Sequence, residues 1–175
     1  MVSSPAGSLD IEIWLHICNH YRMCRHIVVD TSVLISALLG PRGPARETIR
    51  RCLQREYKPL ISNTLFLEYE QVVERPTVLK QCTLTSTELR ELLNAYYSVC
   101  EWIPIYYLWR PNLPDEGDNF LIELAIAGNA NSIVTNNIKD ITRSELLFPE
   151  LQIMTPVRLL RGQWNGYIHN TFTWR

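Results

Sequence analysis

The chain has 175 residues, of which 46% are hydrophobic and 20% are charged, and its formal net charge at pH 7 is −1. This length and composition are typical of one globular domain with a sizeable core, and they exclude a disordered or fibrous chain. The near-neutral charge excludes a protein that binds nucleic acid through a uniformly basic surface, so any such contact needs a local basic patch.

The cysteines and the apolar segments bear on where the protein works. Five cysteines are scattered along the chain without a C-x-x-C pair, which argues against a disulfide framework and a structural zinc site and suits a reducing compartment. The sequence shows no apolar run long enough for a membrane helix and no basic segment typical of a signal peptide. We therefore expect a cytoplasmic protein that works away from membranes.

The two ends of the chain differ in composition from its centre. Residues 1–22 are predicted to be an N-terminal extension, with the hypothesis that Met23 is the native start. Residues 23–161 carry the recognisable strand and helix patterns and are predicted to form the domain. Residues 162–175 are a tail rich in aromatic side chains, and the sequence does not predict where in the fold this tail lies.

The first predicted strand, residues 26–29, is apolar and mostly β-branched without alternation, as expected for a strand buried on both faces. Asp30 follows it directly, and Thr31 or Ser32 is predicted to cap a helix over residues 31–39. Asp30 is therefore expected at the carboxyl end of a central strand, where open α/β sheets bind ligands. A carboxylate is costly to desolvate there without a cation or donor, so Asp30 is a candidate metal ligand.

Short apolar strands and amphipathic helices alternate along the rest of the chain. A Gly- and Pro-rich break at residues 40–44 ends the first helix, and Gly128 is an end signal for a later one. Further helices are predicted at 45–56, 63–74, 86–99 and 119–127, and further strands at 59–62, 102–105, 132–135 and 151–154. This alternation predicts an α/β fold with three layers, α/β/α, around a central parallel sheet of roughly five strands.

Several acids follow strands or begin helices that this topology brings to one edge of the sheet. Besides Asp30, they are Asp115, Asp118 and Asp140, with Asn137 as a further oxygen donor. Glu68 lies inside the helix predicted at 63–74, and because Leu65, Val72 and Val73 share its flank, it is expected to point towards the sheet and not into bulk water. A close pair of carboxylates costs on the order of 4 kcal/mol at an effective dielectric of about 20. Only a divalent cation makes such a cluster tenable, and oxygen ligands indicate Mg²⁺ or Mn²⁺. Hydrolysis of a phosphodiester is the chemistry that suits such a centre.

Each of these acids also has a structural interpretation. Asp118 can cap the helix that follows it, and Asp140 can be a turn residue. Glu68 can face solvent like its neighbours Glu70 and Glu74. Spacing permits the acids to converge but does not establish it.

Arginines recur at helical spacing after the break in the chain. Arg42, Arg46 and Arg50 are four residues apart and predict a basic stripe that can follow an RNA backbone. The alternative is a solvated helix face whose arginines pair with Glu47 and Glu56.

The order of these motifs resembles that of the PIN domain, in particular of the prokaryotic VapC-like ribonucleases that act as toxins in toxin–antitoxin pairs. The resemblance extends from about residue 26 to residue 160. It is carried by five segments: VVDTSVLIS at 28–36, LEYEQVVERP at 67–76, DEGDNFL at 115–121, IVTNNIKD at 133–140 and IMTP at 153–156.

The resemblance implies a set of site residues. By position, Asp30, Glu68 and Asp118 match the acidic, metal-binding triad of the family, and Asp115 matches an additional acid. Many members carry a fourth acid where this chain has Asn136 and Asn137, so that Asn137 or Asp140 is left to complete the metal site. Thr31 and Ser32 are expected to hold Asp30 or a substrate phosphate, a role compatible with helix capping.

The function implied by the resemblance is that of an endoribonuclease that depends on Mg²⁺ or Mn²⁺. Its expected partners are RNA and a protein antitoxin, and a homodimer is carried over by analogy. Aspartyl phosphotransfer is disfavoured, because Ser32 stands where such enzymes need a second acid. The remaining alternative is a weakly active or non-catalytic PIN scaffold that binds RNA or protein, since the fourth acid is missing.

Overall fold

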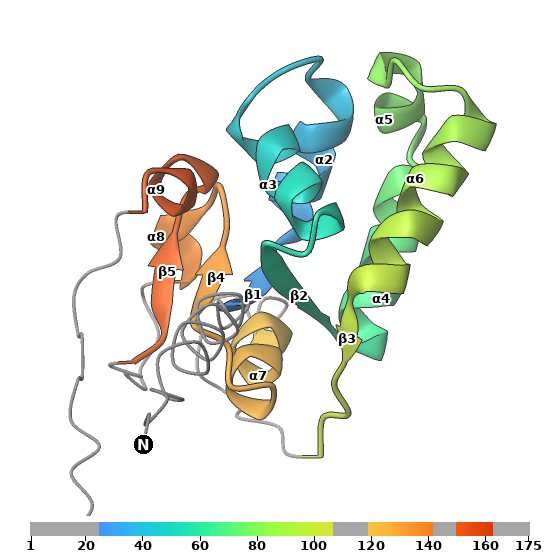
Figure 1. Ribbon diagram of the computed structural model, residues 1–175. Coiled ribbons are helices and arrows are strands. Elements are labelled where there is room, and N and C mark those ends of the chain that lie inside the picture. The colour runs from blue at the N-terminus through green and yellow to red at the C-terminus, as the bar shows by residue number, and fades with distance from the viewer. Residues whose placement is uncertain (1–24, 107–118, 142–149, 163–175) are drawn as a thin grey trace, which may run out of the picture.

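A five-stranded parallel sheet forms the centre of the described part of the chain, residues 25–106, 119–141 and 150–162 of the computed structural model (Figure 1). The strand order is β3-β2-β1-β4-β5. The strands are β1 (Arg25–Val29), β2 (Tyr57–Ile61), β3 (Glu101–Trp102), β4 (Ser132–Val134) and β5 (Gln152–Met154). The central strand β1 pairs in parallel with β2 on one side and β4 on the other, which confirms the predicted topology.

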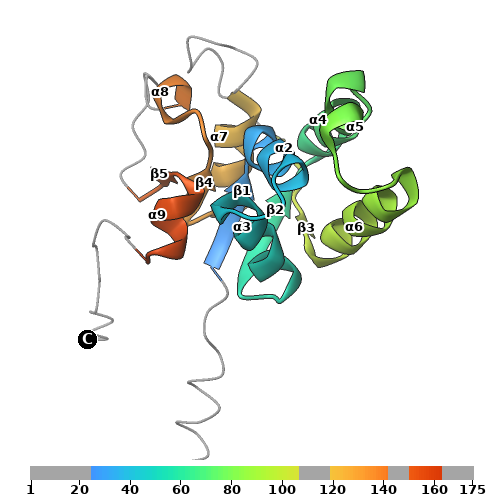
Figure 2. The same cartoon turned by 90° about the horizontal axis from the view of Figure 1, so that it is seen from above.

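Helices cover both faces of this sheet, as the two views show (Figures 1 and 2). They are α2 (Thr31–Leu39), α3 (Pro44–Leu53), α4 (Asn63–Val73), α5 (Pro76–Gln81), α6 (Ser86–Val99), α7 (Asn119–Ala127), α8 (Ile138–Ile141) and α9 (Pro156–Leu160). Helix α7 packs against β1, β2 and β4, and α3 packs against β2 from the other side. The predicted three-layer α/β/α architecture is therefore confirmed. Within the described ranges, no helix is long and apolar enough to cross a membrane.

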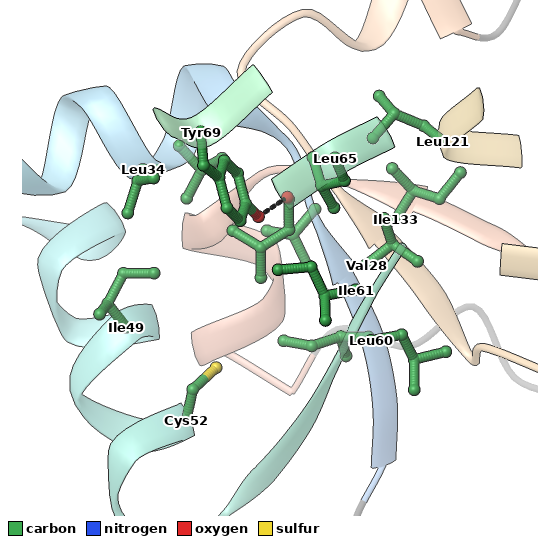
Figure 3. Packing of buried hydrophobic residues seen from close by; sticks show 14 of the residues in the cluster. Val28, Leu34, Ile49, Cys52, Leu60, Ile61, Leu65, Tyr69, Leu121 and Ile133 are labelled. Carbon is green, nitrogen blue, oxygen red and sulfur yellow. Dashed lines mark hydrogen bonds between the residues drawn. The ribbon is translucent and has the colours of Figure 1, made fainter. Parts of the chain in front are cut away.

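The core lies where β1 is enclosed by its neighbours. Ile27, Val28 and Val29 are fully buried, as expected for an apolar strand without alternation. Figure 3 shows Val28 among side chains from β2, α4, α7 and β4, namely Leu60, Ile61, Leu65, Leu121 and Ile133. Burying each such side chain stabilises the fold by about 1.5–3 kcal/mol, so this cluster fixes the position of the residue that follows β1.

The helices and strands of the structure differ from the predicted ones at several boundaries. The helix predicted at 63–74 does end before Pro76, but Pro76 and Pro156 each begin a short helix that was not predicted, at a position where a missing amide costs nothing. Helix α3 ends at Leu53 and not at residue 56, with Arg55 in a left-handed conformation at a φ of 60°. Strand β3 covers only Glu101–Trp102, and Asp140 lies in α8 and not in a loop.

Gly128 follows α7 and lies against β2. A Cβ atom at this position would meet Leu60 Cδ1 at 2.5 Å and Ile103 Cγ1 at 3.1 Å. The left-handed residue at this helix end is not Gly128 but Asn129, with a φ of 50°. Close packing between helix and sheet therefore favours glycine at position 128, because any larger residue would displace the buried Leu60 side chain.

A buried tyrosine ties α4 to the end of β1. The Tyr69 hydroxyl donates a hydrogen bond to the carbonyl oxygen of Val29, the residue before Asp30 (Figure 3). Burial raises the pKa of Tyr69 well above its usual value, so the phenol stays protonated and remains a donor. Leu65, Val72 and Val73 bury the same side of α4, which fixes the distance between this helix and β1.

We expect Tyr69→Phe to lower the free energy of unfolding by about 1–3 kcal/mol, because it leaves a buried carbonyl oxygen without its donor. Urea titration of the variant against the wild-type chain measures this change. Tyr97→Phe is the control, since the half-buried Tyr97 hydroxyl donates to Glu70, which Arg90 also binds. Equal losses in the two variants would contradict a special role for Tyr69.

Candidate functional site

Asp30 stands at the junction of β1 and α2. Its backbone amide donates to the carbonyl oxygen of Val134 at 2.9 Å, which extends the pairing of β1 with β4 by one residue. Asp30 is also the N-cap of α2, with extended backbone angles, but its side chain accepts no capping hydrogen bond. The prediction that Thr31 or Ser32 caps this helix is therefore wrong. The Asp30 carboxylate does not cap the helix either, because it accepts hydrogen bonds from the side-chain hydroxyls of Ser32 and Thr135 and from no backbone amide of α2.

Two hydroxyl groups hold the half-buried Asp30 carboxylate. Ser32 Oγ donates to Asp30 Oδ2 at 2.5 Å, and Thr135 Oγ1 donates to the same oxygen at 2.6 Å. Among the described residues, no hydrogen bond reaches Asp30 Oδ1. The carboxylate is thus fixed in orientation from the first turn of α2 and from the end of β4, and its second oxygen stays available to a ligand.

Glu68 is brought to Asp30 by α4. This helix begins at a capping side chain, since Ser62 Oγ accepts from the Leu65 amide at 3.3 Å. Its buried side packs into the core, and the Tyr69 hydrogen bond sets it beside the end of β1. Glu68 lies next to that buried side, half-buried and with its Oε2 atom fully buried. The prediction that Glu68 points towards the sheet and not into bulk water therefore agrees with its position.

Both carboxylates line one cavity of about 190 Å³, which we call the acid cavity. Its described lining residues are Asp30, Thr31, Ser32, Ile35, Glu68, Val72, Arg75, Thr135, Asn137 and Ile141. Two carboxylates and an amide oxygen in one cavity are a donor set that fits a hard divalent cation such as Mg²⁺ or Mn²⁺. No group of three His, Cys, Asp or Glu side chains able to hold a metal occurs among the described residues. Asp115 and Asp118 lie outside those residues.

The two asparagines after β4 have different positions. Asn136 faces α2, since its side-chain amide donates to the Ser32 carbonyl oxygen at 3.0 Å and to Ser36 Oγ at 2.9 Å. Asn137 lines the acid cavity, and its backbone amide donates to Thr135 Oγ1 at 2.9 Å. Of the two alternatives predicted to complete the site, Asn137 therefore lines the cavity. Asp140 lies on α8, and its side chain is outside the described part.

The predicted basic stripe does not reach the acid cavity. Arg42, Arg46 and Arg50 line a separate, mainly apolar cavity of about 430 Å³ between α2, α3 and α6. Arg46 donates to the Gly40 carbonyl oxygen at 3.1 Å, and Arg50 pairs with Glu47 at 2.6 Å. Hydrogen bonds from Arg50 and then Arg51 lower the pKa of Glu47 to about 2. For Arg50, the alternative prediction of a helix face whose arginines pair with glutamates on the same helix therefore agrees with the structure.

Sequence reasoning missed two residues of the site. Arg75 lines the acid cavity, and its spacing from Glu68 and Val72, seven and three residues, places all three on one side of a helix. This spacing is visible in the sequence, but the predicted helix ended at residue 74, so Arg75 was not assigned to it. Thr135 was assigned to a strand without a role, yet its hydroxyl holds Asp30. No sequence pattern predicts the hydrogen bond between Thr135 and Asp30, because the two residues are far apart in the chain.

The comparisons with known proteins agree with this fold. Residues 26–139 match the PIN domain family, and because this match covers more than half of the chain, the protein belongs to that family. No curated protein gives a significant match to the chain.

Seven chains of solved structures match this one. One is from the crystal structure of VapBC2 from Rickettsia felis bound to a DNA fragment from their promoter, with 18% sequence identity and a TM-score of 0.50. The match covers 74% of this chain and 98% of that chain. At this identity the similarity shows a shared fold.

We expect Asn137→Asp to tighten the binding of Mn²⁺ by at least about tenfold, because it adds a charge to a cavity that already holds two carboxylates. Isothermal titration calorimetry of the two chains measures the change. Asn136→Asp adds the same charge one residue earlier, on a side chain that faces α2, and is expected to change the affinity less. If the two variants bind Mn²⁺ equally well, Asn137 is not a ligand.

Proposed function

We propose that the protein is an endoribonuclease that depends on a divalent cation, Mg²⁺ or Mn²⁺, and that it acts as the toxin of a toxin–antitoxin pair. The observation that carries the catalytic part is the meeting of Asp30 and Glu68 in the acid cavity at the carboxyl end of the sheet. Membership of the PIN domain family supports the nuclease class.

Asp30 and Glu68 would hold the cation, with Asn137 as a neutral oxygen donor and with Asp118 and Asp115 proposed as further ligands. A cation bound there would activate a water molecule and neutralise charge on the scissile phosphate. Ser32 and Thr135 keep the Asp30 carboxylate oriented, since both donate to its Oδ2 atom. Their hydroxyls leave Oδ1 to face the ligand, which is the arrangement expected of groups that orient a metal ligand.

A weakly active or non-catalytic PIN scaffold is the second candidate. The specific observation in its favour is that Asn137, a neutral side chain, lines the acid cavity where many family members have an acid. A cavity with fewer charges holds a divalent cation less tightly. This candidate predicts binding of RNA or protein without cleavage.

A cleavage assay separates the two candidates. Structured RNA is incubated with the purified chain and Mg²⁺ or Mn²⁺, and we expect Asp30→Asn and Glu68→Gln each to lower the rate more than about 100-fold, because the cation contributes several kcal/mol of transition-state stabilisation. Asp118→Asn is expected to act in the same direction. Glu74→Gln is the matched control, since Glu74 is exposed at the end of the same helix.

Each outcome of this assay has one interpretation. Cleavage that is lost in the acid-cavity variants and kept in Glu74→Gln supports the nuclease. Cleavage that survives Asp30→Asn would contradict it. RNA binding without cleavage by the wild-type chain would favour the scaffold.

The antitoxin partner is a separate part of the proposal. The shared fold with a chain of VapBC2 supports it, and the apolar cavity between α2, α3 and α6 is a surface that such a partner can cover. A homodimer, and RNA contacts by Arg42, Arg46 and Arg50, stay predictions.

We expect the gene adjacent to this one to encode a small DNA-binding protein that co-purifies with the chain and inhibits its cleavage of RNA. Co-expression followed by size-exclusion chromatography tests the complex. A chain that cleaves RNA but forms no complex with the product of a neighbouring gene would contradict the toxin role and leave the nuclease intact.

A further inference from the structure

Arg75 places a positive charge at the acid cavity. It is the only Lys or Arg among the described residues that line this cavity. Its side chain is exposed, and no ion pair within the described part of the chain joins it to Asp30 or Glu68. An exposed arginine at the rim of a cavity with two carboxylates is available to a ligand that carries its own negative charge.

The backbone fixes the point from which the Arg75 side chain extends. The Arg75 amide donates to the Val72 carbonyl oxygen at 3.1 Å at the end of α4, and its own carbonyl oxygen accepts from the amides of Val78 and Leu79 in α5. Pro76 follows and restricts residue 75 to the extended conformation that it has, with a φ of −61° and a ψ of 131°. Arg75 is thus the rigid corner between two helices, on the side that also carries Glu68.

A second group of the same cavity points to an anionic ligand. Thr31 is only 4% exposed, lines the acid cavity, and has an Oγ1 atom without a hydrogen-bond partner in the described part of the chain. Buried hydroxyl groups in proteins are nearly always hydrogen-bonded to protein, water or ligand. Thr31 is also the first residue of α2, whose N-terminus receives no side-chain cap and favours negative charge.

We propose that Arg75 and Thr31 form a subsite for a backbone phosphate of the RNA, next to the carboxylates of Asp30 and Glu68. This inference rests on the proposed function and deepens it, since it adds Arg75 to Thr31, the residue already expected to contact a substrate phosphate, and joins the two in one subsite. The guanidinium binds two non-bridging phosphate oxygens, and the Thr31 hydroxyl donates to a phosphate oxygen. The positive charge offsets the repulsion between the phosphate and the carboxylates, so the subsite holds the RNA at the edge of the acid cavity.

The salt dependence of RNA binding tests this subsite without relying on cleavage. Binding of a fluorescein-labelled single-stranded RNA to the full chain is followed by fluorescence anisotropy, with Ca²⁺ in place of Mg²⁺ and over a series of KCl concentrations. Each phosphate contact on a single strand contributes about 0.7 to the slope of log K against log salt concentration. Arg75→Gln is therefore expected to weaken binding about five- to tenfold and to lower the slope by about 0.7.

Three further variants separate the subsite from a structural effect. Arg75→Lys keeps the charge and is expected to keep the slope, with somewhat weaker binding because the two-oxygen contact is lost. Thr31→Val keeps the shape of the side chain and is expected to weaken binding without changing the slope. Arg161→Gln is the matched control, because Arg161 is exposed at the end of α9 and does not line the acid cavity.

The outcomes distinguish this inference from the proposed function. An Arg75→Gln slope equal to that of the wild type or of Arg161→Gln overturns the subsite, even if the chain cleaves RNA. A wild-type chain that shows no salt-dependent RNA binding overturns it as well. A slope that falls by about 0.7 in Arg75→Gln supports the subsite, even if cleavage is absent and the nuclease proposal fails.

Discussion

The parallel pairing of β1 with β4 is the constraint on which the site depends. It continues one residue beyond β1, through the hydrogen bond from the Asp30 amide to Val134, and so brings Thr135 beside Asp30. From there Thr135 Oγ1 reaches the Asp30 carboxylate, and the Ser32 hydroxyl reaches the same oxygen from the first turn of α2. The carboxylate is held by two segments that lie about 105 residues apart in sequence, so its orientation is a property of the folded sheet.

The second acid depends on how α4 is attached to that sheet. Tyr69 is buried and donates to the carbonyl oxygen of Val29, so the helix meets the strand immediately before Asp30. Glu68, the preceding residue, then lines the same cavity as Asp30. Helix α4 ends at Val73, and the corner that follows it at Arg75 adds a cation at the rim of the cavity. Helix α4 and the corner after it thus supply a carboxylate for the proposed metal and a guanidinium for the proposed phosphate contact.

The sequence was sufficient to predict β1, its burial and the place of Asp30, because an apolar strand without alternation and a following carboxylate are local signals. The flank of α4 likewise indicated that Glu68 faces the sheet. Sequence could not distinguish Asn136 from Asn137, since the path of the turn after β4 decides which one faces the cavity. Capping of α2 was predicted wrongly, because Ser32 bonds to the Asp30 side chain across the site. The spacing of Arg42, Arg46 and Arg50 predicted a basic stripe but not its position, and in the fold these arginines line the apolar cavity between α2, α3 and α6 instead of the acid cavity.

A crystal structure of the chain with Mn²⁺ would show whether Asp30 and Glu68 together hold a divalent cation. Anomalous scattering locates the ion independently of any assumption about activity. We expect an anomalous peak in the acid cavity at about 2.0–2.6 Å from Asp30 Oδ1 and a Glu68 carboxylate oxygen, a range typical of hard cations with oxygen ligands. An empty acid cavity at Mn²⁺ concentrations that support RNA cleavage, or a peak elsewhere in the molecule only, would contradict it.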